Sequence, residues 1–513
     1  MEINGDYVNY RLSEGDLGSM VHEDGRLAIS PVPDSPVAEG DRKRVKNLAT
    51  ILASSAKRPL LVVGKGAAYS RCEDILSTFV SRTSIPFLPT PMGKGLLPSS
   101  HPLDVSAARS LALKGADLII LLGARLNWIL HFGEPPKLAP NIQIAKIDIN
   151  TEELGRNLAT PGVSSSAQGE ELSIVGDCGA VLIQLIEELN NVGWEGLGHT
   201  NDNPWLGQLK STAESSVMKL HRKLHTPTPQ DQKLTYHRTF HLLQKVLADL
   251  SIETYGGDLQ NWEDNVVLVC EGANTMDISR SIFPISKPRQ RLDAGTDATM
   301  GVGTGYAIAS WCAYNLPPST NIPGEEGKET PILDAPKRKK IVAIEGDSAF
   351  GFSAMEIETM ARYHMDIIVI VINNGGVYKG IEYTDDGSSG SSTPGGPVIP
   401  TWSSDPRRDT ITLPSTALSH HTQYATLGNA LGAKGFQVWG VGDGSDASGG
   451  IEEELVRKVR EAWKASEGEL GPNGEAGKRG PAVIDVEIES GAQKELAFAW
   501  LGGEKGKNTD SRL

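Results

Sequence analysis

Short, almost wholly apolar runs recur along the chain, and each ends in Gly, Asn or a charged residue. They occupy residues 58–66, 116–124, 142–150, 265–272, 340–347, 366–374 and 481–489. Helical candidates lie between or after these runs, at Cys72–Arg82, Ala180–Leu189, Val302–Tyr314, Ala354–Tyr363 and Ile451–Ala465. Apolar strands that alternate with helices are typical of parallel sheets covered on both faces. The sequence therefore predicts an α/β fold with two doubly wound parallel-sheet domains.

The two α/β blocks are joined by a polar connection rich in Asn, Gly, His, Thr and Pro. We expect a first domain at residues 13–195, a linker with one helix at 196–235, and a second domain at 236–500. Low-complexity segments interrupt the second domain, at 317–337, 385–396 and 442–450. Their composition cannot bury enough apolar surface to order them, so we expect surface insertions.

Composition excludes several classes of function. The net charge of -15 over 513 residues argues against a nucleic-acid partner, which would require a basic face. No stretch approaches the roughly 20 apolar residues of a membrane span, and the N-terminus lacks the apolar core of a signal peptide. The four isolated cysteines favour neither a zinc site nor a disulfide scaffold. We expect a soluble intracellular protein without nucleic-acid or membrane partners.

The strongest signal for chemistry is Gly346-Asp347-Ser348 at the end of one predicted strand, with Asn374 at the end of the next. Parallel α/β sheets build ligand sites at the carboxyl ends of their strands. A carboxylate, an amide oxygen, a backbone carbonyl and phosphate oxygens together satisfy an octahedral Mg²⁺. The alternative is a capping Asp and a turn Asn in an arbitrary α/β protein.

The residues around this pair fit the same interpretation. Gly375 and Gly376 suit a tight turn that aims a carbonyl inward. Ser353 could cap the helix that follows it, which would turn a helix N-terminus toward an anion.

At this point a family resemblance becomes clear. The stretch 346–380, GDSAFGFSAMEIETMARYHMDIIVIVINNGGVYKG, resembles the cofactor motif of thiamine diphosphate enzymes, in the form found in 2-hydroxyacyl-CoA lyases and oxalyl-CoA decarboxylases. The resemblance implies that the side chains of Asp347 and Asn374 and the carbonyl of Gly376 bind Mg²⁺, which anchors the cofactor diphosphate. Gly346 and Ser348 belong to the same cofactor motif. Tyr378 would reach toward the substrate; a core tyrosine at the sheet edge is the alternative.

A second stretch, 271–310, is similar to the family segment that precedes the metal motif. The resemblance implies that the Ala298 carbonyl accepts a bond from the aminopyrimidine, and that Met300 is the wedge that bends the cofactor. A core methionine is the plain alternative. Asn274 corresponds to a position on the acyl-CoA side of the family site. The following GVGTGY departs from GxGxxG at Tyr306, so we interpret it as a helix start near the cofactor.

The first block resembles the middle domain of the family in VVGKGAAY, PFLPTPMGKG, GARLNWILHFG and IDIN. In relatives that handle acyl-CoA this domain binds ADP or the nucleotide end of CoA. The resemblance points to Lys65, Arg125, Asp148 and Asp177 as ligands for phosphates and ribose. Each could equally be a solvated loop charge.

The start of the chain resembles the end of a further family domain. GDYVNYRL looks like its exit, so residues 1–12 would be a remnant of a pyrimidine-binding domain. In the family that domain supplies the glutamate that activates the cofactor, and the resemblance assigns no glutamate of this chain to that role. We expect the cofactor to bind weakly and stay largely unactivated, in a truncated product or in a chain whose missing domain comes from elsewhere. The resemblance also implies a homo-oligomer for the intact enzyme.

The tail, 501–513, ends in Ser511-Arg512-Leu513, which matches the small–basic–Leu pattern of the peroxisomal import signal; a chance tripeptide is the alternative. FAWLGG just before it resembles the lyase tail. We therefore expect a peroxisomal lyase dependent on thiamine diphosphate and Mg²⁺. It would cleave 2-hydroxyacyl-CoA to formyl-CoA and a shortened aldehyde in fatty acid α-oxidation. An oxalyl-CoA decarboxylase and a non-catalytic nucleotide- or CoA-binding protein are the alternatives.

Overall fold

The computed structural model describes residues 37–156, 172–198, 203–230, 232–257, 259, 261–295, 297–316, 338–378, 380, 416–419, 422–439, 450–468 and 477–490. The expected remnant 1–12, the tail with Ser511-Arg512-Leu513, and the insertions 317–337, 385–396 and most of 442–450 lie outside these residues.

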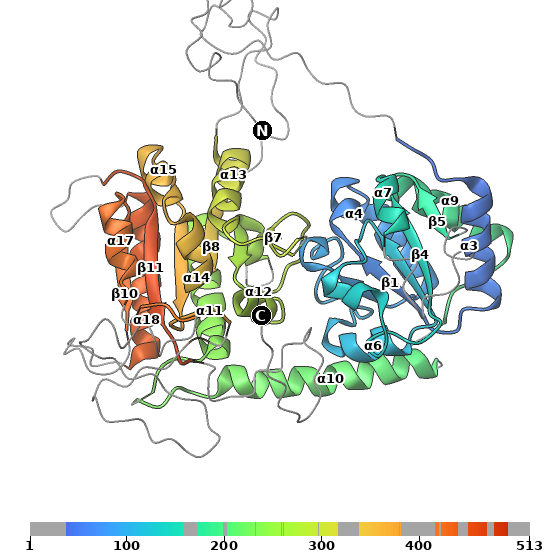
Figure 1. The fold of residues 1–513 in the computed structure, drawn as a ribbon, viewed down its shortest axis with the longest axis horizontal. Helices are drawn as coiled ribbons and strands as arrows, with labels where there is room; N and C mark the ends of the chain where they lie inside the picture. The colour runs from blue at the N-terminus through green and yellow to red at the C-terminus, as the bar shows by residue number, and fades with distance from the viewer. Residues whose placement is uncertain are drawn as a thin grey trace, which may run out of the picture. The chain divides into compact units, whose positions relative to one another are not determined.

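The first domain holds a five-stranded sheet in the order β2-β1-β3-β4-β5, and every pair in it is parallel (Figure 1). Its strands are β1 (Pro59–Val63), β2 (Phe87–Pro89), β3 (Leu118–Leu122), β4 (Gln143–Asp148) and β5 (Ser173–Val175). Its helices are α3 (Arg42–Ser54), α4 (Lys65–Tyr69), α5 (Glu73–Thr83), α6 (Arg109–Gly115), α7 (Thr151–Gly155) and α9 (Cys178–Asn191). The three apolar runs of this half all form strands, as predicted.

Alternate residues of this sheet enter two separate cores. Leu61, Val63 and Ile120 pack with α3, α5 and α9, whereas Leu60 and Val62 pack on the other face with α6. Because neighbouring side chains point to opposite faces, a strand buried on both sides must be apolar throughout. This requirement explains why the sequence shows continuous apolar runs.

The second domain holds a six-stranded, all-parallel sheet in the order β10-β11-β9-β8-β6-β7 (Figure 1). Its strands are β6 (Val266–Glu271), β7 (Arg291–Asp293), β8 (Lys340–Gly346), β9 (Ile368–Asn373), β10 (Lys434–Val438) and β11 (Ala482–Glu487). Its helices are α11 (Tyr236–Tyr255), α12 (Ala273–Ser279), α13 (Gly303–Asn315), α14 (Asp347–Ser353), α15 (Glu356–Arg362), α17 (Tyr424–Ala430) and α18 (Ile451–Glu467).

Helices cover both faces of this sheet as well. One face packs against α11, α12 and α18, with Leu268 and Ile370 among its strand residues. The other packs against α13, α14, α15 and α17, with Val269 and Val369. The predicted fold class, two doubly wound parallel-sheet domains, is confirmed.

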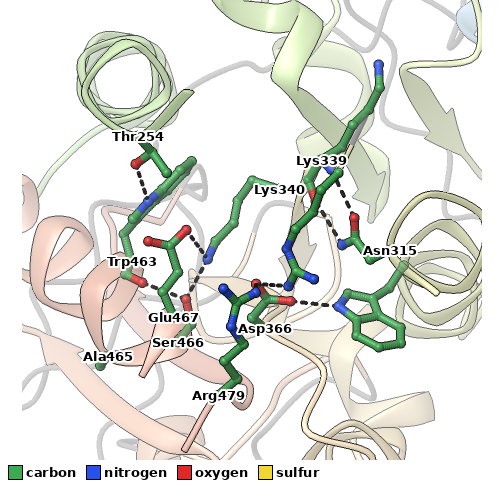
Figure 2. A network of polar contacts seen from close by, with 12 residues as sticks. Thr254, Asn315, Lys339, Lys340, Asp366, Trp463, Ala465, Ser466, Glu467 and Arg479 are labelled. Atoms are coloured by element: carbon green, nitrogen blue, oxygen red, sulfur yellow. Dashed lines mark hydrogen bonds and ion pairs between the residues drawn. The ribbon is translucent and has the colours of Figure 1, made fainter. Parts of the chain in front are cut away.

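The amino edge of the second sheet carries a network of buried charges, which Figure 2 shows from close by. Lys340 opens β8, and its ammonium donates to Ser466 Oγ at 2.7 Å and to Glu467 at 3.4 Å, over the ring of Trp463. Asp366, which precedes β9, accepts from the indole of Trp311 at 2.7 Å and also pairs with two arginines, Arg338 and Arg479. These buried charges each have partners of complementary type.

In the described residues of the polar connection, α10 (Pro204–His225) forms a helix of 22 residues. Asn203 caps it by accepting from the N–H groups of Trp205 and Leu206, and a proline follows at the first helical position. None of the described helices is long and apolar enough to cross a membrane.

Candidate cofactor site

A cavity of about 300 Å³ opens at the carboxyl edge of the second sheet. The order of the strands reverses between β6 and β8, since β7 pairs on the outer side of β6 while β8 pairs on the inner side. Such a switch point leaves a crevice between the loops that leave the two strands. The residues predicted for the cofactor line this cavity: Ala298, Met300, Gly346, Asp347, Ser348, Asn374 and Gly376. Tyr378, predicted to reach toward the substrate, and Asn274, predicted for the acyl-CoA side, line it too.

Asp347 and Asn374 come together because β8 and β9 are hydrogen-bonded neighbours, with Gly346 level with Ile372. Asp347 begins α14, and its Oδ1 accepts from the Ser348 N–H at 2.7 Å. Its Oδ2 accepts from the N–H groups of Asn374 at 3.2 Å and Gly376 at 3.0 Å. The turn after β9 thus wraps around the carboxylate that ends β8, which confirms the juxtaposition expected from sequence.

Burial raises the pKa of Asp347 to about 6, although the N–H groups of Ser348, Gly376 and Gly375 act to lower it. Its side chain is almost fully buried, and the bonds described above come from neutral donors. A buried carboxylate in such surroundings favours a bound cation. Beside it stand the amide oxygen of Asn374 and the backbone of Gly376, which are the hard oxygen donors that Mg²⁺ prefers. The residues present therefore fit a Mg²⁺ ion that holds a diphosphate.

The loop before α13 carries two of the predicted cofactor residues. Ala298 has φ of 55°, a left-handed conformation that is uncommon for a residue with a Cβ. Met300 is 40% exposed. Glu271, the last residue of β6, accepts from the N–H groups of Gly301 and Gly303 and thereby ties this loop to the sheet.

Level with Glu271 on the neighbouring strand lies a second buried acid, Glu345, whose carboxyl oxygens have no hydrogen-bond partner among the described residues. Burial and the nearby charge of Glu271 raise the pKa of Glu345 well above its ordinary value. Glu345 therefore holds its proton more tightly than an ordinary carboxyl group. The pKa of Glu271 is also raised by burial, but the N–H groups of Gly303 and Gly301 oppose that shift. Sequence reasoning missed this pair, although acids at the ends of two otherwise apolar strands were a visible signal.

Known proteins were compared with the chain. Residues 45–185 match the family model of the thiamine pyrophosphate enzyme central domain, and residues 271–486 match the C-terminal TPP binding domain. The human 2-hydroxyacyl-CoA lyase 1 is 33% identical over 507 residues, which cover 98% of this chain and 70% of the human protein. The Saccharomyces cerevisiae 2-hydroxyacyl-CoA lyase is 36% identical over 463 residues, 90% of this chain and 65% of the yeast protein. An Escherichia coli oxalyl-CoA decarboxylase is 34% identical over 398 residues, 77% of this chain and 56% of that protein.

The chain belongs to the thiamine pyrophosphate enzyme family, among its carbon–carbon lyases. It spans between 56% and 70% of the length of these three relatives.

The wall of the cavity near Tyr378 contains two polar residues, Asn274 and Tyr236. Asn274 donates from Nδ2 to the Tyr378 carbonyl at 2.6 Å, so the structure places it in the cofactor cavity. Tyr236, the first residue of α11, accepts from Asn374 Nδ2 at 3.0 Å. Sequence reasoning missed Tyr236, since nothing in LTYHRTF distinguishes it from a helix-start tyrosine.

The expectation for Ser353 was wrong. α15 begins after Met355 and has no side-chain cap. Ser353 instead ends α14, and its Oγ accepts from the Thr304 hydroxyl at 2.7 Å. The helix that faces the site is α14, which starts directly at Asp347 because the chain turns into a helix as soon as β8 ends.

The first domain, matched by the central-domain model of the family, has a cavity of about 250 Å³ at the carboxyl ends of β1, β3 and β4. Lys65, Arg125 and Asp148 line it, at the point where the strand order of this sheet reverses. Burial and the nearby Arg125 guanidinium lower the pKa of Lys65. Asp177 is not among the lining residues; it caps α9 by accepting from the N–H groups of Gly179 and Ala180.

Proposed function

We propose that the protein is a lyase dependent on thiamine diphosphate and Mg²⁺, which cleaves a 2-hydroxyacyl-CoA to formyl-CoA and an aldehyde one carbon shorter. The observation that carries the proposal is the carboxylate of Asp347, which is buried without a cationic partner in the described residues. It lies beside Asn374 and Gly376, at a switch point of the sheet. The similarity to 2-hydroxyacyl-CoA lyases over nearly the whole chain supports this reaction class.

The residues of the cavity would have three roles: binding the metal, holding the cofactor rings and contacting the substrate. Asp347, Asn374 and the Gly376 carbonyl would hold Mg²⁺, and through it the diphosphate. Ala298 would offer its carbonyl to the aminopyrimidine, and Met300 would support the bend between the two rings. Tyr378, 44% exposed at the mouth, would face the acyl part of the substrate. When bound, the cofactor supplies the carbon nucleophile and the electron sink for cleavage of the C1–C2 bond.

Calorimetry with thiamine diphosphate and Mg²⁺ tests the binding step, and detection of formyl-CoA from a 2-hydroxyacyl-CoA tests the reaction. We expect binding that requires both the cofactor and the metal. If thiamine diphosphate binds with the same heat and affinity with and without Mg²⁺, the metal assignment is contradicted. Release of CO₂ from oxalyl-CoA, without cleavage of the 2-hydroxyacyl substrate, would favour the decarboxylase alternative.

The cavity of the first domain supports a second part of the proposal: that it takes the nucleotide end of CoA, or ADP. Lys65 and Arg125 would meet phosphates, and Asp148 would meet a ribose hydroxyl. ADP titration of the wild-type chain and of Arg125→Ala tests this assignment; equal affinities would overturn it. ADP binding without any thiamine diphosphate binding would favour a non-catalytic nucleotide-binding protein.

We also propose a homo-oligomer and a peroxisomal location, which rest on the family resemblance and on Ser511-Arg512-Leu513. Light scattering of the purified chain tests the first. Imaging of the tagged protein with and without the last three residues tests the second, and an unchanged distribution would contradict the import signal.

A further inference from the structure

To bind a metal, Asn374 must present its side-chain oxygen rather than its side-chain nitrogen. The two ends of a side-chain amide have nearly the same shape, so an asparagine can face a metal with either one. Only the oxygen can bind Mg²⁺. Something in the protein must therefore select one of the two orientations.

The bonds of the Asn374 nitrogen provide that selection. Nδ2 donates to the backbone carbonyl of Tyr378 at 3.1 Å and to the hydroxyl of Tyr236 at 3.0 Å. A carbonyl oxygen can only accept, so a flipped Asn374 would place two acceptors against each other. Both N–H groups of the amide are used, and Oδ1 is left toward Gly376 N and the cavity.

Tyr236 is itself held firmly. It lies at the N-terminus of α11, where Thr235 caps the helix, and its ring packs edge-on against Phe240 with centroids 5.9 Å apart. Its side chain is buried, and its hydroxyl accepts from Asn374 Nδ2. The packing of the ring and the start of the helix therefore hold the hydroxyl in place.

The same group of residues holds the turn that carries Tyr378. Asn274 donates to the Tyr378 carbonyl at 2.6 Å, so two amides converge on this one acceptor. Tyr378 has φ of 60°, an unfavourable conformation that persists only where its surroundings enforce it. The two asparagines and Tyr236 thus form one connected set that fixes both the amide and the turn.

We propose that Tyr236 is a positioning residue for the metal: its hydroxyl holds the Asn374 amide so that Oδ1 faces Mg²⁺. This inference rests on the proposed function, but it concerns Tyr236, which lies outside both family segments of the second domain. Partners of this kind behind metal ligands affect affinity by about 10–100-fold.

The experiment compares Tyr236→Phe with Tyr424→Phe in the full chain. Tyr424 is a matched control: it is buried, packs edge-on against Phe350, and lies near enough to Asp347 for the carboxylate to raise its pKa. Its hydroxyl bonds Thr422 rather than Asn374. Mn²⁺ affinity is measured by titration in the presence of thiamine diphosphate, and thermal unfolding of both variants is recorded.

We expect Mn²⁺ to bind about 10–100-fold more weakly to Tyr236→Phe, and within about twofold of wild type to Tyr424→Phe, at comparable loss of stability. Hydrogen exchange of residues 373–378 in the metal-free chain should rise in the first variant only. Unchanged Mn²⁺ affinity in Tyr236→Phe would overturn the inference. If the wild type binds neither Mn²⁺ nor the cofactor, the proposed function fails; the exchange measurement still decides whether Tyr236 positions Asn374, because unchanged exchange overturns that too.

Discussion

The two edges of the second sheet bury charge in opposite ways. At the amino edge, Lys340 and Asp366 are each surrounded by groups of complementary charge or hydrogen-bonding type (Figure 2). At the carboxyl edge, the acids Asp347, Glu271 and Glu345 are buried with neutral donors or with each other. Buried charge with a complete set of partners serves the fold, whereas buried charge without a counterion marks a place for a ligand.

The two aspartates make the contrast measurable. Burial acts to raise the pKa of Asp366, but Lys340, Trp311 and Arg338 outweigh it, so the pKa is lowered. Burial raises the pKa of Asp347 to about 6 because its N–H donors do not offset the loss of water. An ionised aspartate thus stabilises the fold at the amino edge of the sheet and destabilises it at the carboxyl edge.

The largest effect is expected from removing the proposed metal ligand. Asp347→Ala should weaken Mg²⁺-dependent binding of thiamine diphosphate by more than about 100-fold, since even partners behind a ligand affect affinity by 10–100-fold. Asp366→Asn, at the opposite edge, should leave that affinity unchanged in the folded protein. Calorimetry on both variants checks the pair; equal losses would mean that the two edges do not have separate roles.

A second prediction concerns the sign of stability changes in the cofactor-free chain at pH 7. Asp366→Asn should lower the free energy of unfolding by about 2 kcal/mol, because charge-assisted hydrogen bonds are lost. Asp347→Asn should raise it, by about 3 kcal/mol at most, because a carboxylate that is costly to bury becomes neutral. Urea unfolding of the two variants and the wild type gives both values.

The pH dependence of these changes also has a definite sign. The contribution of Asp366 is present above its ordinary pKa and is lost as pH falls through its lowered pKa, so the cost of Asp366→Asn shrinks in acid. The gain from Asp347→Asn is full above about pH 6 and disappears below about pH 4, where the wild-type carboxyl becomes protonated in the unfolded state as well. If both variants change stability in the same direction at pH 7, the contrast between the edges is wrong.

A smaller effect is expected at the acid pair. Glu271→Gln replaces one of the two oxygens that hold Gly301 and Gly303 with a donor, so the loop with Ala298 and Met300 should loosen and cofactor affinity fall about 10-fold. Glu345→Gln is the matched control, since glutamine resembles a carboxyl group that holds its proton. Cofactor titration compares them, and a greater loss in Glu345→Gln would reverse the roles assigned to the two acids.

The smallest effect concerns Ala298. Glycine adopts its left-handed conformation without a steric cost, but it also loses more freedom on folding. Ala298→Gly should therefore stabilise the chain by about 1 kcal/mol at most, with little change in cofactor affinity. Thermal unfolding measures the difference, and a destabilised variant would show that the alanine methyl group packs usefully in the loop.

How far sequence reasoning reaches follows from these same residues. The long apolar strands and the Asp347–Asn374 pair were predictable, since local pattern and a helix-plus-strand spacing determine both. The three-residue strands β2, β5 and β7 were not, because so few residues carry no periodic signal. Asp177 has the same local pattern as a ribose ligand but caps a helix. The contact of Tyr236 with Asn374 joins residues 138 positions apart, so only the folded chain reveals it.

The lack of a side chain at Gly303 limits which substitutions the sequence can accept during evolution. A Cβ built there would lie 2.1 Å from a carboxyl oxygen of Glu345 and 2.8 Å from one of Glu271. Any side chain at position 303 must therefore displace the carboxyl ends of Glu345 and Glu271, so substitutions at these positions should depend on one another. In a library of random variants, tolerated replacements of Gly303 should occur together with compensating changes at Glu345, as a linked pair of substitutions.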